Sequence, residues 1–178
     1  MNPNHRNTSL IPTFTGRLVD VLDLRPETID IRDIAHALSQ FCRFTGHSRF
    51  HYSVGQHSLL VSRIVPARFA LHGLLHDASE AYLGDISRPL KHSDVMERYR
   101  ELEFRTQQVI NEKFGLPLHE PDEVKHADLV ALSTEFRDVV NRQEEDLGLP
   151  PPHKDTIRKI QPEVVEDWFL ARFMELTK

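Results

Sequence analysis

LLHDASEAYLGDISRPLK, residues 74–91, indicates both how this chain folds and where its chemistry lies. The stretch sets His76 directly before Asp77 in an apolar, helix-forming context. Burying an ionised carboxylate costs several kcal/mol unless the group is paired or coordinates a metal. On a helix Glu80 shares a face with both residues, and Asp85 follows just beyond the expected helix end. The stretch therefore supplies four potential metal ligands, bases or substrate contacts.

The composition fits one compact domain without a membrane span. Of 178 residues, 39% are hydrophobic and 28% are charged, which allows burial of roughly two thirds of the unfolded surface. No apolar run approaches the length of about 20 residues that a membrane helix needs, and the N-terminus lacks the pattern of a secretory signal. The only cysteine, Cys42, can form no internal disulfide. We therefore expect a cytoplasmic protein.

The charge pattern argues against a polynucleotide partner. The net charge is -5, and the lysines and arginines are scattered among acids rather than gathered in a basic stripe. Small anions remain suitable substrates, because a few positive side chains and a metal can capture a phosphate within an acidic protein.

Hydrophobic periodicity predicts an all-α fold of about six helices. Residues 1–29 form an irregular arm with a short strand pair near residues 17–22, and residues 30–178 form the helical domain. An acidic, proline-rich stretch at residues 143–155 is expected to be a surface loop. The expected helices begin near Asp30, Ser53, Pro66, Ser93, Pro121 and Pro162.

Two of these helices have further features. Ser53 and Gln56 form a capping box at the start of one helix. The helix over residues 66–83 is apolar on more than one side, which predicts a central position and a buried His76-Asp77 pair.

Three helices each offer polar residues on an apolar face: His57, the pair His76-Asp77, and Asp128. Singly, each has an ordinary explanation: a hydrogen-bonded core histidine, an ion pair with an arginine, or a solvated face. Together they predict a metal site. Two imidazoles and two carboxylates suit Mn, Fe, Co, Ni, Zn or Mg, and four protein ligands leave positions open for water and substrate. Glu135 falls on the same expected face as Asp128, without an assigned role.

A competing ligand pair is His72 and His76, which lie four residues apart as in helical zinc sites. That zinc motif carries a glutamate directly after its first histidine, whereas Gly73 follows here. His72 then has a packing role or supports a ligand.

A helical histidine, then His-Asp, then a distant aspartate resembles the HD superfamily of metal-dependent phosphohydrolases. HDASEAYLGDISRPLK is especially similar to the deoxyribonucleoside 5'-monophosphatase branch of that superfamily. The resemblance spans most of the chain, from IRDIAHALS through CRFTGH and YSVGQHS to VKHADLVALSTEFRD. These segments also resemble small prophage-encoded members and the phage dATP triphosphohydrolases. The resemblance implies an HD-domain helical bundle over residues 30–178.

The resemblance also implies the metal ligands and a proton-transfer group. One divalent metal, Co, Mn, Zn, Ni or Fe with Mg also possible, is expected on His57, His76, Asp77 and Asp128. Glu80 is the implied acid/base group, which relays a proton.

Substrate contacts follow from the same resemblance. Asp85 is implied to touch the nucleotide or the attacking water. Arg43-Phe44 matches an arginine–aromatic pair that clamps phosphate and base in the monophosphatases. Relatives often have Trp where this chain has Phe44, so the base preference stays open. Lys91 is expected to meet phosphate oxygens, with a solvated lysine as the alternative.

The sequence therefore predicts a hydrolase that releases phosphate from 2'-deoxynucleotides. The first hypothesis is a 5'-deoxynucleotidase, and the alternative is a dNTP triphosphohydrolase that releases triphosphate. A third hypothesis is an inactive nucleotide-binding regulatory module. The expected partner is a small deoxynucleotide, with no polynucleotide and no membrane, and the resemblance implies a homo-oligomer.

Overall fold

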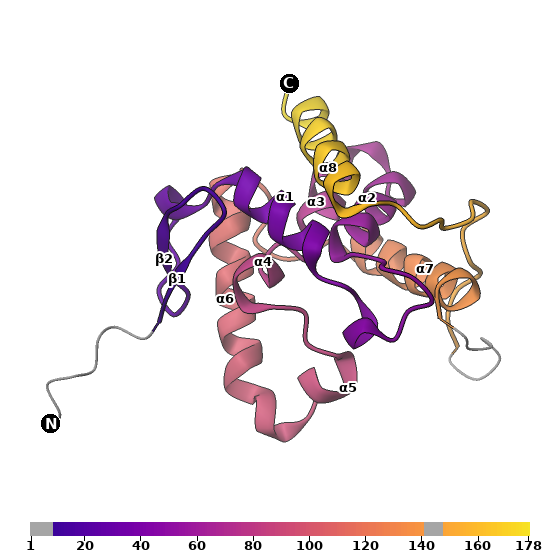
Figure 1. Ribbon diagram of the computed structural model, residues 1–178, viewed down its shortest axis with the longest axis horizontal. Helices are drawn as coiled ribbons and strands as arrows, with labels where there is room; N and C mark the ends of the chain where they lie inside the picture. The colour runs from indigo at the N-terminus through magenta and orange to yellow at the C-terminus, as the bar shows by residue number, and fades with distance from the viewer. Residues whose placement is uncertain (1–8, 141–147) are drawn as a thin grey trace, which may run out of the picture.

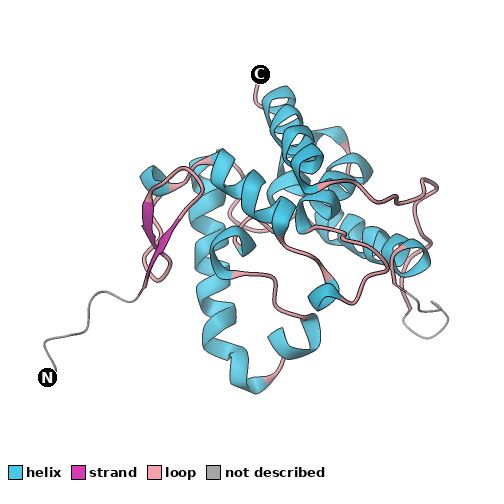
Figure 2. Cartoon of the chain, in the orientation of Figure 1, coloured by secondary structure: helices cyan, strands magenta, loops and turns pink. Residues whose placement is uncertain are grey.

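A computed structural model describes residues 9–140 and 148–178, and it is dominated by helices (Figures 1 and 2). A two-stranded antiparallel sheet consists of β1 (Leu10–Pro12) and β2 (Leu18–Asp20). The helices are α1 (Ile31–Gln40), α2 (Val54–Ile64), α3 (Ala70–Leu75), α4 (Glu80–Leu83), α5 (Arg88–Lys91), α6 (Glu97–Lys113), α7 (Asp122–Asp138) and α8 (Pro162–Leu176). The expected all-α class is confirmed, although the described helices are more numerous and shorter than expected. Residues 1–8 of the expected arm and 143–147 of the expected loop lie outside the described ranges.

The main core lies where α1, α2, α3 and α8 pack together (Figure 1). Its fully buried side chains include Leu38 of α1, Leu74 of α3 and Phe169 of α8. Val19 of β2 is also 0% exposed and belongs to the same cluster, so the N-terminal arm is packed against the helices. Among the described residues, no helix has the length and apolarity needed to cross a membrane.

Polar side chains cap the first turns of α1 and α2. The Asp30 side chain accepts a hydrogen bond from the Arg32 N–H at α1, and the Ser53 side chain accepts one from the Gln56 N–H at α2. The reciprocal half of the expected capping box does not form: the Gln56 Oε1 atom that should accept from the Ser53 N–H is buried without a hydrogen-bond partner. The Gln56 amide nitrogen donates to the Arg158 carbonyl at 2.8 Å.

The prediction of one continuous helix over residues 66–83 is wrong. It is interrupted at residues 76–79, where backbone turns join α3 to α4. The physical reason is Gln107 of α6, whose side chain binds the backbone groups of Leu75 and Ser79 that a continuous helix would join. The His-Asp pair therefore lies in a turn between two helices.

Helix α6 holds the segment that follows α4. The Tyr99 hydroxyl donates to the Gly84 carbonyl at 3.1 Å. Arg100 donates to the carbonyls of Lys91 and Ser93 at 2.7 and 2.8 Å. Figure 1 shows α5 beside the end of α6 from which these side chains come. The helix expected from residue 93 to residue 115 is confirmed as α6, although its α-helical part begins about one turn later than expected.

Candidate metal centre

Four side chains converge where α2, the turn at residues 76–79 and α7 meet. The His57 Nε2 atom lies 3.2 Å from His76 Nε2 and 3.2 Å from Asp128 Oδ1. The Asp77 Oδ2 atom lies 3.3 Å from His76 Nε2 and 3.6 Å from His57 Nε2. Ligand atoms bound at about 2.1 Å to one ion are about 3.0 to 3.4 Å apart. The group of His57, His76 and Asp128 can therefore hold a metal ion, with Asp77 directly beside it.

Both histidines present the same ring nitrogen to this point. His57 Nδ1 is hydrogen-bonded to Glu135 Oε1 at 2.6 Å, and His76 Nδ1 is bonded to the Gly73 carbonyl at 2.9 Å. Because each acceptor takes the Nδ1 proton, each neutral ring has its lone pair on Nε2. Two lone pairs that face each other repel unless a proton or a cation lies between them. The residues present therefore fit a divalent cation.

The charges around His57 favour a bound positive group. Without a cation, burial and Arg43 lower the pKa of His57, but Glu135 and Asp128 outweigh them and raise it to about 9. Burial alone would raise the pKa of Asp128, yet the hydrogen bond and the charge of His57 hold it well below its usual range. A cation must displace the proton on His57, so cation affinity should increase with pH.

Glu135 of α7 orients His57. Its side chain is 0% exposed, and its second oxygen accepts a hydrogen bond from Arg43 at 3.1 Å. Burial alone would raise the pKa of Glu135, but Arg43 and His57 lower it, so the carboxylate is ionised. A carboxylate behind a ligand histidine fixes the ring and its tautomer. The sequence indicated only that Glu135 shares a face with Asp128.

Glu135→Gln should weaken both the fold and the metal centre. The amide keeps the size of the side chain but leaves the Arg43 charge without its closest carboxylate, so we expect an unfolding free energy lower by about 3–5 kcal/mol. Cation affinity should fall about 10- to 100-fold. Urea unfolding and calorimetric titration with Co²⁺ measure these two effects. Glu112→Gln, an exposed change on α6, is the matched control and should alter neither. Wild-type stability and affinity in Glu135→Gln would contradict the orienting role.

The expected phosphate-and-base clamp lies next to these ligands. An Arg43 guanidinium nitrogen is 3.6 Å from Asp77 Oδ2, and the Phe44 ring centroid lies 5.5 Å from the guanidinium carbon. Phe44 and Thr45 have φ angles of 57° and 52°, which residues other than glycine rarely adopt. Such strained backbone clusters at functional sites. Because Arg43 is paired with carboxylates here, its contact with phosphate stays a prediction.

Glu80 lies at the start of α4, beside the centre, and is 4% exposed. Burial raises the pKa of Glu80 well above its usual value, and the negative charge of Asp77 adds to this. Lys91 Nζ lies 3.3 Å from Glu80 Oε1 and 2.7 Å from Glu103 Oε1. The second oxygen of Glu80 is buried without a hydrogen-bond partner. Lys91 is thus held by two carboxylates, and its expected contact with phosphate stays a prediction.

Two further carboxylates border the site. Asp85 directly follows Gly84, whose φ of +83° ends α4. Burial raises the pKa of Asp85, and the charge of Asp77 raises it further. Burial also raises the pKa of Glu120, which responds to both Asp77 and Asp128. Glu120 lies in the loop before α7, where no periodicity or motif points to it, so the sequence analysis missed it.

The competing histidine pair is not brought together with the other ligands. His72 is buried, and it lies outside the group formed by His57, His76 and Asp128. Burial and the charge of His76 together lower the pKa of His72 to about 4. The structure therefore places His72 outside the group of converging ligands.

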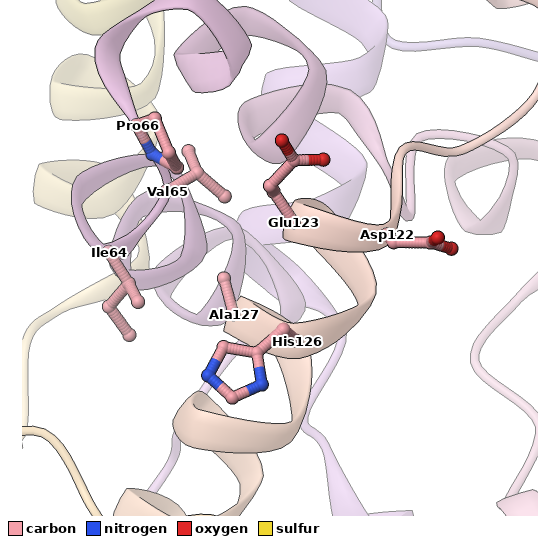
Figure 3. A pocket seen from close by; sticks show the side chains of 7 residues that line it. All are labelled: Ile64, Val65, Pro66, Asp122, Glu123, His126 and Ala127. Atoms are coloured by element: carbon pink, nitrogen blue, oxygen red, sulfur yellow. The ribbon is translucent and has the colours of Figure 1, made fainter.

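A hollow of about 360 Å³ lies between the end of α2 and the first turns of α7 (Figure 3). It is lined by Ile64, Val65, Pro66, Asp122, Glu123, His126 and Ala127. None of these residues belongs to the converging ligands, so the hollow is distinct from the metal centre.

No family model matches the chain. The chain is 45% identical over 131 residues to the uncharacterized protein YfdR of Escherichia coli, an alignment that covers 74% of this chain and 72% of YfdR. It is 38% identical over 123 residues to an uncharacterized protein of Rhodobacter capsulatus, covering 64% of this chain and 62% of that protein. Neither name states an activity.

Proposed function

This chain belongs to the same family as YfdR of Escherichia coli, and we propose that it is a divalent-metal-dependent 5'-deoxynucleotidase of the HD superfamily. It would convert 2'-deoxynucleoside monophosphates to deoxynucleosides and phosphate. The observation that carries the proposal is the convergence of His57, His76 and Asp128 beside the buried Glu80. The resemblance of HDASEAYLGDISRPLK to the monophosphatases supports the substrate class.

His57, His76, Asp77 and Asp128 would hold the cation. A divalent cation there would polarise a phosphoryl oxygen and lower the pKa of a bound water. The two carboxylates offset the two positive charges of such an ion, so a phosphate needs further positive charge nearby. Arg43 supplies it if substrate phosphate displaces the long 3.6 Å contact with Asp77.

Glu80 is placed to handle the proton of the reaction. Water attacks phosphorus in line with the 5'-oxygen, the new P–O bond forms as the P–O5' bond breaks, and the leaving oxygen takes up a proton. Glu80 can supply the proton that the leaving oxygen needs and afterwards regain one, by way of solvent, from the water that attacked. Lys91 holds one oxygen of Glu80 in place. The other oxygen is then available for this transfer.

The surrounding charge favours a monophosphate over a triphosphate. Asp77 has acidic electrostatic neighbours in Glu80, Asp85 and Glu120. In the described part of the chain, Arg43 and Lys91 are both paired with carboxylates of the site. A dNTP brings two more phosphates, which would meet this acidic rim with no further charge compensation from Arg43 or Lys91.

Product analysis tests the proposal. Metal-free protein is reloaded with Co²⁺ or Mn²⁺ and incubated separately with each dNMP, with AMP and with dATP. We expect free phosphate from the dNMPs, less from AMP, and no tripolyphosphate from dATP. Tripolyphosphate from dATP with intact dNMPs would establish the triphosphohydrolase instead. If the metal-loaded protein turns over no nucleotide, the enzymatic proposal is rejected in favour of a binding module.

A further inference from the structure

A side chain of α6 closes the turn that carries the His-Asp pair. In a continuous α-helix the Ser79 N–H would donate to the Leu75 carbonyl. Here the Ser79 N–H donates to Gln107 Oε1 at 3.0 Å, and Gln107 Nε2 donates to the Leu75 carbonyl at 2.8 Å. The side-chain amide thus takes the place of this helical hydrogen bond: it is the partner of the Ser79 N–H, and it is a second donor to the Leu75 carbonyl, which also accepts from the Ala78 N–H at 3.1 Å.

This insertion matters for the metal ligands because neighbouring residues of a regular helix point about 100° apart. A histidine and the aspartate after it would therefore diverge. In the turn, however, His76 Nε2 and Asp77 Oδ2 lie 3.3 Å apart. The backbone is tightened here, since the Glu80 N–H donates to the Asp77 carbonyl, three residues back, at 3.0 Å. A side chain inserted into the helical ladder is an established cause of such an interruption.

Gln107 is itself held in place. Its Nε2 also donates to Asn111 Oδ1 at 3.0 Å, and Asn111 Nδ2 donates to the Pro117 carbonyl at 3.1 Å. Asn111 is 1% exposed. Glu103, one turn earlier on α6, binds Lys91 at 2.7 Å. Glu103, Gln107 and Asn111, each four residues apart, therefore form a polar row along one face of α6.

The chemistry of the position is specific to a primary amide. The Gln107 side chain accepts one hydrogen bond and donates two. A carboxylate has no donor, a lysine has no acceptor, and leucine has neither. Only asparagine has the same groups, and its chain is one methylene shorter.

We propose that Gln107 is a positioning residue for the metal centre, because its amide fixes the tightened turn from which the consecutive residues His76 and Asp77 reach the same cation. The inference rests on the metal binding that the proposed function requires, and does not depend on the substrate.

Binding of Co²⁺ alone tests this role. In Gln107→Leu we expect cation affinity about 10- to 100-fold weaker and an altered visible absorption spectrum of the bound Co²⁺, which reports its ligand geometry. The thermal midpoint of the metal-free protein is measured in parallel. Gln108→Leu, one position further along α6, is the matched control and should leave affinity and spectrum unchanged. A residue that only stabilises the fold would lower the midpoint without changing the spectrum.

A folded Gln107→Leu protein with wild-type Co²⁺ affinity and spectrum overturns the proposal. If that variant does not fold, Gln107→Glu decides: it keeps the acceptor for Ser79 but loses the donor for Leu75, so weaker affinity supports the role and wild-type affinity overturns it. In the unchanged protein, slow hydrogen exchange of the Ser79 amide is also required, and fast exchange rejects the bond. Co²⁺ binding that depends on Gln107 in a protein that hydrolyses no dNMP would reject the nucleotidase and leave this inference standing.

Discussion

Asp77→Ala is expected to abolish both stoichiometric cation binding and nucleotide hydrolysis. The carboxylate oxygen of Asp77 lies 3.3 Å from His76 Nε2 and 3.6 Å from His57 Nε2, so the substitution would remove a proposed ligand atom directly beside the group of His57, His76 and Asp128. Loss of a direct ligand should weaken cation affinity by more than the roughly 100-fold upper effect of residues that only support ligands. In the proposed reaction hydrolysis would fall with it, because the cation would supply the main electrostatic stabilisation of the reacting phosphoryl group.

Metal analysis after dialysis against a slight excess of Co²⁺, together with phosphate release from dAMP, measures both effects. Asp94→Ala removes an exposed aspartate ahead of α6 and serves as the control, with wild-type metal content and activity. Asp77→Asn separates charge from shape, since its amide oxygen can still reach the cation but carries no charge. The proposed centre is ruled out if Asp77→Ala retains full metal content and hydrolysis.

Local features of this chain could be predicted from its sequence because their causes lie a few residues apart. The side chains of Asp30 and Ser53 cap the helices that follow them, as expected. Helical periodicity placed Glu135 and Asp128 on one face of α7, and the structure buries Glu135 completely and brings Asp128 to His57. The same reasoning put His57 on an inner face, where it is 0% exposed.

The remaining features depend on pairs that are distant in sequence. The amide of Gln107 reaches Ser79 across 28 residues, and nothing within residues 66–83 signals that this helix is broken. Glu135 and His57 are 78 residues apart, so their contact follows only from the packing of α7 against α2. Local periodicity cannot supply such pairings, because the same residues would suit several packings.

Lys91 shows the same limit for a functional residue. A lysine at the end of RPLK is compatible with a phosphate ligand or with a solvated side chain. The structure instead holds its ammonium between Glu80 and Glu103. Charge pairs of this kind depend on how α4, α5 and α6 meet, which short motifs do not specify. A resemblance identifies residue types that carry chemistry, whereas the fold decides which charges they meet.

Glu80→Gln is expected to separate catalysis from metal binding. Glutamine cannot transfer a proton at this position, and loss of a general acid or base costs about 10²- to 10⁴-fold in kcat. The amide oxygen can still accept the hydrogen bond from Lys91, and Glu80 is not among the converging ligands. Bound Co²⁺ should therefore remain at the wild-type level. Glu112→Gln is again the exposed control, and wild-type kcat in Glu80→Gln would exclude proton transfer by this residue.

The same change should stabilise the metal-free protein at alkaline pH. Burial raises the pKa of Glu80 in the folded state well above the value of 4.5 that the unfolded chain has. The folded protein therefore binds this proton up to a higher pH than the unfolded chain does, so the wild type loses stability as pH rises above 4.5. Glutamine resembles the neutral acid and avoids that loss. We expect a higher Tm for Glu80→Gln at pH 8, with a difference that shrinks toward pH 4.5. An equal Tm at pH 8 would show that ionisation of Glu80 costs the fold nothing.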